Sequence, residues 1–194
     1  MTRKTLSVLG SGSYGTALAV HLARAGHPVT LWARRPDMAE ELQRERMNHK
    51  YLANQPFPDL LQVTSDLGET TDAEIVLVVV PSHGFREVTR AYLERHPGGR
   101  PVLLVSATKG METETLARMS QVAEEEGQAA GREVIFAVLS GPRFAAELVA
   151  GSPTAAVVAS TDHELAADLR EQLATSSLRL YSSDDVAGVE LGGT

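Results

Sequence analysis

Short apolar segments alternate with longer amphipathic segments along most of the chain. The apolar run over residues 74–80 is rich in β-branched residues and lacks polar alternation, which is typical of a strand covered on both faces. This pattern predicts strands at 6–9, 28–32, 74–80, 102–106, 134–139, 155–159 and 178–181. Helical spacing of apolar positions between them predicts helices at 16–25, 36–47, 83–95, 113–126, 142–149 and 162–174. Such an alternation predicts an α/β protein with a doubly wound, mainly parallel sheet and helices on both faces.

Residues 48–65 interrupt this alternation. Pro56 and Pro58 indicate a loop, because proline cannot donate a backbone hydrogen bond to a neighbouring strand. We therefore expect mostly irregular structure here, with residues 62–64 compatible with a short strand.

A glycine-rich turn separates the first expected strand from the first expected helix. Gly10, Gly12 and Gly15 have the G-x-G-x-x-G spacing of a dinucleotide-binding turn. The first glycine permits a sharp turn, the second leaves room for a pyrophosphate, and the third lets the helix pack closely on the strand. The N–H groups at the start of the helix also attract negative charge. With the expected sheet, this turn predicts a Rossmann-type fold that binds a dinucleotide.

The end of the second expected strand bears on which dinucleotide is bound. An acidic residue at this place usually holds the ribose 2′-hydroxyl of NAD, but here Arg34 and Arg35 come first and Asp37 is the first acid. Guanidinium groups form charge-assisted bonds to a 2′-phosphate, so NADP(H) is favoured, with NAD(H) also compatible. Two alternatives stay open. The pair could be ordinary surface arginines, or Arg34 could stack on adenine and serve either cofactor.

Lys109 follows another expected strand, in the turn at residues 106–110. In open parallel sheets the carboxyl ends of the strands face the ligand crevice, where a lysine can donate to a carbonyl or phosphate oxygen. A lysine on a surface loop is the plain alternative. Gly110, where the chain can turn, favours the functional interpretation.

Two more turns follow expected strands. In the turn at 140–145, Gly141 permits a close backbone approach and the helix that follows offers an anion site, although an ordinary strand-to-helix turn would look the same. In the turn after residue 80, we interpret Ser82 as a helix N-cap and His83 as a helix-start residue rather than a catalytic acid. We expect all these turns to lie at one edge of the sheet.

The composition narrows the function classes. The 194 residues suit one domain, or at most two, and a net charge of −7 without any basic stretch argues against a nucleic-acid partner. The chain has no cysteine, which excludes disulfides and thiol catalysis, and its histidines lack metal-ligand spacing. We find no stretch of membrane-spanning length and no apolar core of a signal peptide, so we expect a cytoplasmic protein without a metal site.

Several motifs occur together in the order and spacing of one known family. The segments that carry the resemblance are 10–19, 48–52, 80–83, 107–110, 140–142 and 190–193. They resemble the bacterial NAD(P)-dependent glycerol-3-phosphate dehydrogenases over essentially the whole chain. The resemblance implies reversible hydride transfer between the nicotinamide and dihydroxyacetone phosphate, which gives sn-glycerol 3-phosphate for glycerophospholipid synthesis.

The resemblance also implies roles for individual residues. Ser13 and Tyr14 would approach the pyrophosphate, and Arg34 with Arg35 the 2′-phosphate. The full set of cofactor-binding residues would be Gly10, Gly12, Ser13, Tyr14, Gly15, Arg34, Arg35, Pro81, Lys109 and Ala145, and the substrate-binding residues would be Lys109, Gly141 and Arg143. The chain departs from the family pattern at Arg143, where a small hydroxyl residue is usual, and at Ala53, where proline is usual.

The chief departure from the family is length. By the resemblance, residues 1–183 form the dinucleotide-binding domain and residues 184–194 begin the helix that leads to a helical substrate domain, absent here. The family's proton-donating lysine would lie just beyond Thr194, so no catalytic residue is assigned within the chain. We expect the chain alone to bind the cofactor but to turn over negligibly, and a homodimer is compatible with the resemblance. A 3-hydroxyacid-type dehydrogenase and a non-catalytic dinucleotide-binding module remain the alternative functions.

Overall fold

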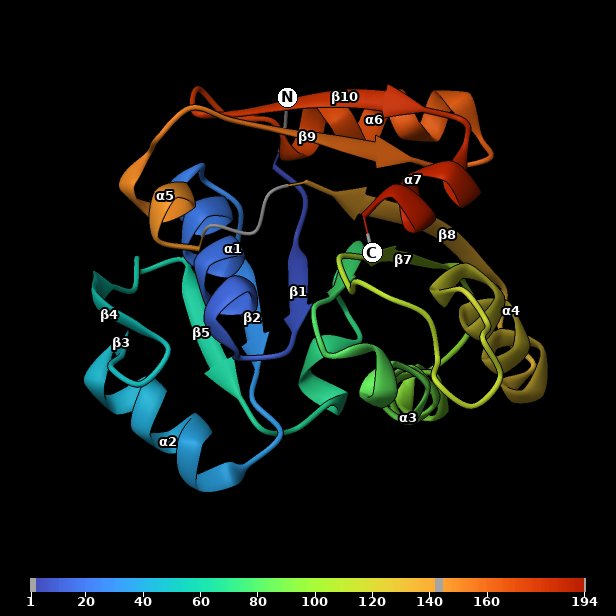
Figure 1. The fold of residues 1–194 in the computed structure, drawn as a ribbon. Coiled ribbons are helices and arrows are strands. Elements are labelled where there is room, and N and C mark those ends of the chain that lie inside the picture. Colours follow the sequence, from blue (N-terminus) through green and yellow to red (C-terminus); the bar gives the residue numbers. More distant parts are fainter. Residues whose placement is uncertain (1–2, 142–144, 194) are drawn as a thin grey trace.

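The computed structural model describes residues 3–141 and 145–193 and is built on a single eight-stranded sheet (Figure 1). The strands lie in the order β10-β9-β8-β7-β6-β1-β2-β5. Their bounds are β1 Leu6–Leu9, β2 Val29–Trp32, β5 Leu61–Thr64, β6 Ile75–Val78, β7 Val102–Ser106, β8 Val134–Ser140, β9 Thr154–Ala159 and β10 Leu178–Ser183. The fold is thus the predicted doubly wound α/β sheet.

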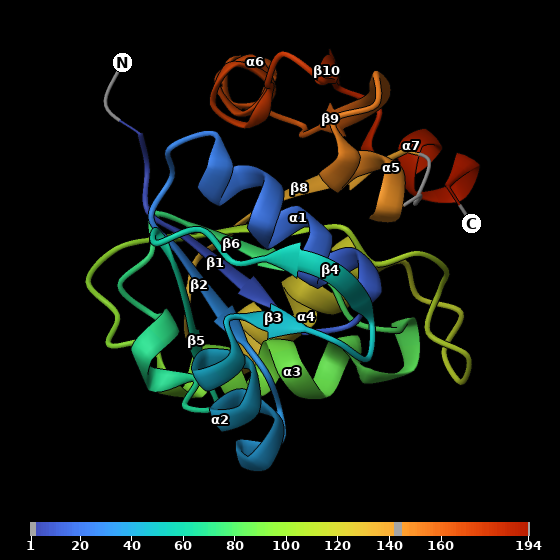
Figure 2. The same cartoon turned by 90° about the vertical axis from the view of Figure 1, so that its left-hand side faces the viewer.

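Helices cover both faces of the sheet. The helices are α1 Ser13–Arg24, α2 Pro36–Glu45, α3 Ser82–Arg95, α4 Met119–Ala130, α5 Ala145–Ala150, α6 His163–Leu173 and α7 Val186–Gly192, with a short 3₁₀ turn at Gly68–Thr70. Apolar residues of α1, α2, α5 and α6 share one core cluster, whereas those of α3 and α4 belong to the cluster on the opposite face. Figure 2 shows the central strands between α1 and α3.

Burial on both faces explains the continuous apolar run of β6. Ile75 and Leu77 lie in the α1 cluster, while Val76 and Val78 lie in the α3 cluster, because successive side chains of a strand point to opposite faces. All four are at most 1% exposed. A polar residue at any of these positions would lose its water without gaining a partner.

The sheet is parallel except at one pair. β8 and β9 run antiparallel, and β10 is parallel to β9, so the last two strands point opposite to the other six. The chain moves outward from β1 through β2 to β5, and then returns to the other side of β1 to continue as β6, β7 and β8. The order therefore reverses between β1 and β6, and the carboxyl ends of β1, β2, β6, β7 and β8 share one edge.

The expectation of mostly irregular structure at 48–65 is wrong in part. β3 (Met47–Asn48) and β4 (Leu52–Pro56) pair antiparallel as a small hairpin that the sequence does not predict. The short strand compatible with residues 62–64 is confirmed as β5, which pairs in parallel with β2. β4 has no apolar alternation, since only its first residue, Leu52, is buried. Without that alternation, the strand cannot be recognised from the sequence.

The helix expected at 113–126 begins later, at Met119. Leu116 has a φ of 58°, which no right-handed helix accommodates. The Thr115 hydroxyl donates to Glu112 Oε2 at 2.6 Å and accepts from the backbone N–H of Ala117 at 3.1 Å. Such local side-chain bonds compete with helix formation, so the segment folds as a turn.

Among the described residues, no helix is long and apolar enough to cross a membrane. Nor do those residues contain a group of three or more His, Asp or Glu side chains placed to hold a metal ion.

Candidate functional site

The glycine turn joins β1 to α1 through backbone packed against backbone. Gly10 has a φ of 124°, and a side chain there would overlap the carbonyl oxygen of Val79. A side chain at Gly15 would in turn overlap the carbonyl oxygen of Gly10. These two glycines are therefore required by the close approach of β1, α1 and the end of β6, as the sequence predicts for the first and third positions.

Gly12 differs from the other two glycines. Its φ of −69° suits any residue, and a Cβ added there would have no protein atom within 4 Å. Gly12 is exposed and immediately precedes Ser13, the first residue of α1. The N–H groups of the first helical turn lack partners within their own helix, so this end of α1 carries positive potential. No described protein atom requires glycine here, so the space in front of this end of α1 is open to a ligand.

A buried amide supports the turn from the other side. Asn48, which is 1% exposed, donates from Nδ2 to the Ser11 carbonyl oxygen at 3.1 Å and to Thr16 Oγ1 at 2.9 Å. Its Oδ1 accepts the backbone N–H of Tyr51 at 3.0 Å. Asn48 thereby connects the β3–β4 hairpin to both ends of the glycine turn.

A cavity of about 470 Å³ opens beside this turn. Its volume is within the usual range of small-molecule sites, about 300–1,000 Å³. The lining residues are Gly10, Ser11, Gly12, Trp32, Arg34, Arg35, Met38, Lys50, Tyr51, Val79, Val80, Pro81, His83, Gly84, Glu87 and Val88. They come from the ends of β1, β2 and β6, from α2 and α3, and from the β3–β4 connection. The cavity therefore lies where the strand order reverses, which is the usual ligand site of such sheets.

The lining carries more cationic than anionic side chains. Arg34, Arg35 and Lys50 face a single carboxylate among the described lining residues, that of Glu87. Arg35 Nε lies 3.8 Å from Asp37 Oδ1, with both side chains more than half exposed, so this pair is weak. Arg34 is exposed and makes no ion pair with any residue the structure describes. Both guanidinium groups are thus available to an anion.

Lys109 lies on the next turn along the sheet edge rather than in the cavity lining. The preceding residue, Thr108, donates from Oγ1 to the Val80 carbonyl oxygen at 2.9 Å. Gly110 has a φ of 93°, and a Cβ there would be 3.3 Å from Ser82 Oγ. The Lys109 turn therefore packs directly on the start of α3, next to the cavity.

The start of α3 differs from the sequence prediction in the identity of its N-cap residue. The helix begins at Ser82 itself, with Pro81 as the N-cap residue and no side-chain capping bond, so the prediction of Ser82 as the N-cap is wrong. His83 is exposed in the first turn of α3 and lines the cavity.

The turn after β8 gives a structural reason for its glycine. A Cβ at Gly141 would lie 2.7 Å from the Cβ of Ala156 on β9, so packing alone requires glycine there. Ala145 begins α5 and is buried. Arg143, a predicted substrate contact, lies outside the described residues with its neighbours Pro142 and Phe144. Gly193, after α7, approaches the Ser140 hydroxyl at the end of β8.

The chain is similar to known proteins in both sequence and structure. A family model described as the N-terminus of NAD-dependent glycerol-3-phosphate dehydrogenase matches residues 5–166. The chain belongs to this family. Glycerol-3-phosphate dehydrogenase [NAD(P)+] of Citrobacter koseri is 49% identical over 192 residues, which cover 97% of this chain and 55% of that protein. The protein of the same name from Escherichia coli O1:K1 / APEC is 48% identical over the same shares.

Solved structures agree with this assignment. The crystal structure of glycerol-3-phosphate dehydrogenase from Coxiella burnetii superimposes with a TM-score of 0.87 at 36% identity, covering 98% of this chain and 57% of that one. The chain thus spans about half the length of the glycerol-3-phosphate dehydrogenases it matches.

In this glycerol-3-phosphate dehydrogenase domain, the structure gathers only part of the predicted set into one cavity. Gly10, Gly12, Arg34, Arg35 and Pro81 line it, whereas Ser13, Tyr14, Gly15, Lys109, Gly141 and Ala145 are not among its lining residues. The turns nevertheless leave the same edge of the sheet, as expected.

Site reasoning from the sequence missed several lining residues of the dehydrogenase domain. Lys50 and Tyr51 reach the cavity from the β3–β4 connection, and the Lys50 ammonium lies 5.0 Å from the Tyr51 ring centroid. Trp32 lines it from the end of β2. The segment 48–52 already stood among the family motifs, and that signal could have identified these residues.

Proposed function

We propose that this chain is the cofactor-binding part of a glycerol-3-phosphate dehydrogenase and that the cavity beside Gly12 holds NAD(P)H. The single observation that carries the proposal is the open space at Gly12, in front of the first turn of α1. A pyrophosphate is the ligand group that needs both this space and the positive helix end.

The residues around the cavity suit the parts of a dinucleotide. The backbone at Gly12, Ser13 and Tyr14 would hold the pyrophosphate, with Gly10 and Gly15 keeping the turn in shape. Pro81, from the end of β6, would border the same molecule. When bound, the nicotinamide supplies or accepts a hydride, and the protein's part is to orient it and to exclude water.

NADP(H) is the favoured cofactor in this proposal. Arg34 and Arg35 are exposed on the cavity edge after β2, where a 2′-phosphate would be recognised, and neither has a strong ion pair with a described residue. A phosphate can accept bidentate, charge-assisted bonds from guanidinium, whereas a ribose hydroxyl cannot. NAD(H) fits the same cavity with weaker bonds at this end.

The substrate side is assigned to the neighbouring turns. For the whole protein we propose reduction of dihydroxyacetone phosphate to sn-glycerol 3-phosphate, the substrate class in the names of its relatives. Lys109 would donate to the substrate and to the cofactor from the turn that packs on α3, Gly141 would border the substrate, and Ala145 would border the nicotinamide. An alkoxide that forms on hydride transfer must be protonated or electrostatically held, which a nearby ammonium can do.

The division of the chain follows from the same proposal. Residues 1–183 would form the dinucleotide-binding domain, and 184–194, which include α7, would begin the connection toward the rest of the protein. Gly193 beside Ser140 would then bring the following chain to the sheet edge where the substrate reacts.

The test is a substitution that fills the space at Gly12. Gly12→Ala adds one methyl group that meets no protein atom, so the unfolding temperature should stay unchanged. Affinity for NADPH should fall at least about tenfold, because the methyl group occupies the approach of the pyrophosphate. Trp32, the single tryptophan, lines the cavity and reports binding through its fluorescence.

Gly192→Ala is the matched control for this test. It also adds a methyl group in open space, but on α7, away from the cavity. Both variants should fold like the parent, and only Gly12→Ala should lose affinity. Equal NADPH affinity in the parent and Gly12→Ala would overturn the proposal.

A further inference from the structure

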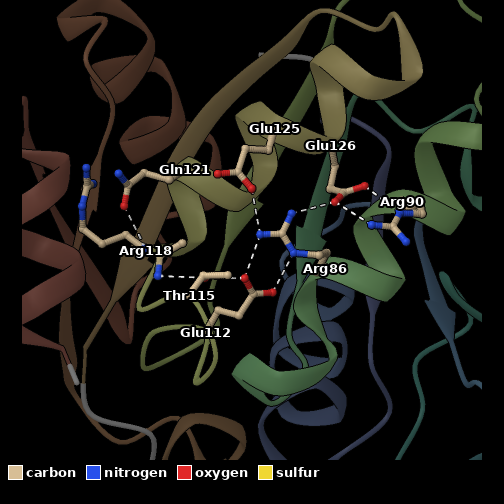
Figure 3. A network of polar contacts seen from close by, with 9 residues as sticks. Arg86, Arg90, Glu112, Thr115, Arg118, Gln121, Glu125 and Glu126 are labelled. Carbon is tan, nitrogen blue, oxygen red and sulfur yellow. Dashed lines mark hydrogen bonds and ion pairs between the residues drawn. The ribbon is translucent and has the colours of Figure 1, made fainter.

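A network of ion pairs surrounds the Arg86 guanidinium, one helical turn into α3 (Figure 3). Arg86 Nε and Nη2 donate to Glu112 Oε1 and Oε2, both at 2.7 Å, which makes a bidentate pair. Arg86 Nη1 donates to Glu126 Oε1 at 2.8 Å, and Nη2 lies 2.8 Å from Glu125 Oε2. All three guanidinium nitrogens are therefore engaged by carboxylates.

The partners belong to three different segments. Arg86 is on α3, Glu125 and Glu126 are on α4, and Glu112 is in the irregular connection between β7 and α4. The buried carboxylate of Glu126 also binds a second arginine of α3, because Arg90 donates to Glu126 at 2.8 and 2.9 Å. Glu112, in contrast, has Arg86 as its cationic partner among the described residues.

The Arg86–Glu112 pair is strong for a pair near the surface. Their side chains are 24% and 15% exposed, and the bidentate geometry aligns two charge-assisted bonds. These bonds, supported by one from the Thr115 hydroxyl, lower the pKa of Glu112 to about 2. The same carboxylates raise the pKa of Arg86. The pair is therefore ionised at neutral pH.

The pair bears on the site because Glu112 is three residues from Lys109. The connection between Ser106 and Met119 has no regular secondary structure, so side-chain bonds help to hold it in place beside the backbone bond from the Ala107 N–H to the Val78 carbonyl oxygen at 2.9 Å. One bond holds it just before Lys109, from Thr108 Oγ1 to the Val80 carbonyl oxygen at 2.9 Å. The Arg86–Glu112 pair holds it just after. Lys109 lies between these two attachments, of which one is to Val80, just before α3, and the other to Arg86 on α3.

We infer that Arg86 and Glu112 are positioning residues for Lys109: their bidentate pair holds the Lys109 turn against the first turn of α3, beside the cavity. A lysine side chain has four rotatable bonds and loses much of its effect when its backbone also moves. With the turn held in place, the backbone of Lys109 is fixed, and its ammonium contacts the cofactor and the substrate from a constant position. This inference rests on the proposed role of Lys109.

A purely structural role is the competing explanation, since Arg86 also binds α4. Replacing Arg86 would leave Glu126 buried with fewer partners and would destabilise the whole domain. Replacing Glu112 avoids this, because the bonds from Arg86 and Arg90 to Glu126 remain. Glu112→Ala is therefore the informative variant.

The first measurement follows the turn directly, without any ligand. The chain contains no cysteine, so Met111→Cys, at a residue 37% exposed, accepts a single nitroxide label beside Lys109. In the full chain, adding Glu112→Ala should narrow the electron paramagnetic resonance lines as the turn gains motion. Glu125→Ala, which removes an Arg86 partner outside the turn, is the control. An unchanged spectrum for Glu112→Ala would overturn the inference.

The second measurement is a double-mutant cycle on NADPH affinity. Lys109→Met should weaken binding at least about tenfold, and Glu112→Ala about threefold. If Glu112 acts through Lys109, Glu112→Ala should have no further effect in the Lys109→Met background. Independent, multiplying losses would show a general structural role and overturn the inference.

The two measurements separate the possible failures. If Lys109→Met binds NADPH as tightly as the parent, the proposed cofactor contact of Lys109 is wrong, and the positioning role is overturned with it. The spectra would still show in that case whether the pair holds the turn. If Gly12→Ala also keeps its affinity, the proposed cavity itself is wrong.

Discussion

Asn48 offers the sharpest test of how the glycine turn is held. Asn48→Ala removes a buried amide that makes three hydrogen bonds, to Ser11, Thr16 and Tyr51, at 2.9–3.1 Å. The Ser11 carbonyl oxygen keeps one donor, the Thr16 hydroxyl at 3.2 Å, so the turn is loosened but retains one bond.

The size of the effect follows from these bonds. A net contribution of roughly 1 kcal/mol for each bond, plus the small cavity left by truncation, gives a loss of about 2–4 kcal/mol. Folded domains have about 5–15 kcal/mol of stability, so the Asn48→Ala variant should still fold. Its unfolding temperature should fall by roughly 5–15 °C, since 1 kcal/mol corresponds to about 2–4 °C at this chain length.

The assay is urea unfolding followed by Trp32 fluorescence, together with NADPH titration of the folded protein. Binding should weaken by roughly tenfold, because the turn must be ordered when the ligand arrives. Gln62→Ala is the control, since Gln62 is exposed and bonds to the Gln43 amide at 2.8 Å on the surface. A loss below about 0.5 kcal/mol for Asn48→Ala, the size of an ordinary surface change, would refute the reasoning.

Three further outcomes are expected. Replacing both Arg34 and Arg35 by Gln should weaken NADPH binding at least about tenfold and NADH binding little, because only NADPH has the 2′-phosphate; equal losses would refute the preference. The Glu190 side chain is 7% exposed and accepts hydrogen bonds from the Ser120 hydroxyl and backbone N–H at 2.6 and 2.8 Å. Glu190→Gln should therefore speed amide hydrogen exchange in α7, and unchanged exchange would contradict this. The pKa of Glu112, lowered from 4.5 to about 2, lies below its unfolded value, so its stabilisation is present above pH 4.5 and is lost as the pH falls toward 2. The urea midpoints of the parent and Glu112→Gln should accordingly converge over that range, and a constant difference would count against the pair.

Much of the fold was predictable because local pattern and global structure agree. The apolar run of β6 fits the central strand of a parallel sheet, and the glycine turn predicts the β1–α1 junction. The prediction failed where the pattern of apolar positions does not report the structure. β4 exposes most of its residues, and the start of α4 depends on the bonds of Thr115 and on a left-handed Leu116.

The site was predictable in part for the same reason. Gly12, Arg34 and Arg35 stand next to the glycine turn or the second strand, where position along the chain corresponds to position at the sheet edge. Lys50 and Tyr51 come from a hairpin whose place over the turn depends on Asn48. The spacing of apolar and polar residues does not predict that place. The Arg86–Glu112 pair joins residues 26 apart in sequence, and charges alone could not have paired them.

The amino-acid sequence by itself determined the layered architecture, the edge of the sheet that carries the turns, and the family. These follow from periodicity and from glycines that each local backbone requires. Tertiary structure alone decided which glycine is required by packing, since Gly141 is crowded by Ala156 whereas Gly12 faces open space. It also decided which carboxylates bind Arg86. Such outcomes depend on distances between distant segments, and only the folded chain sets those distances.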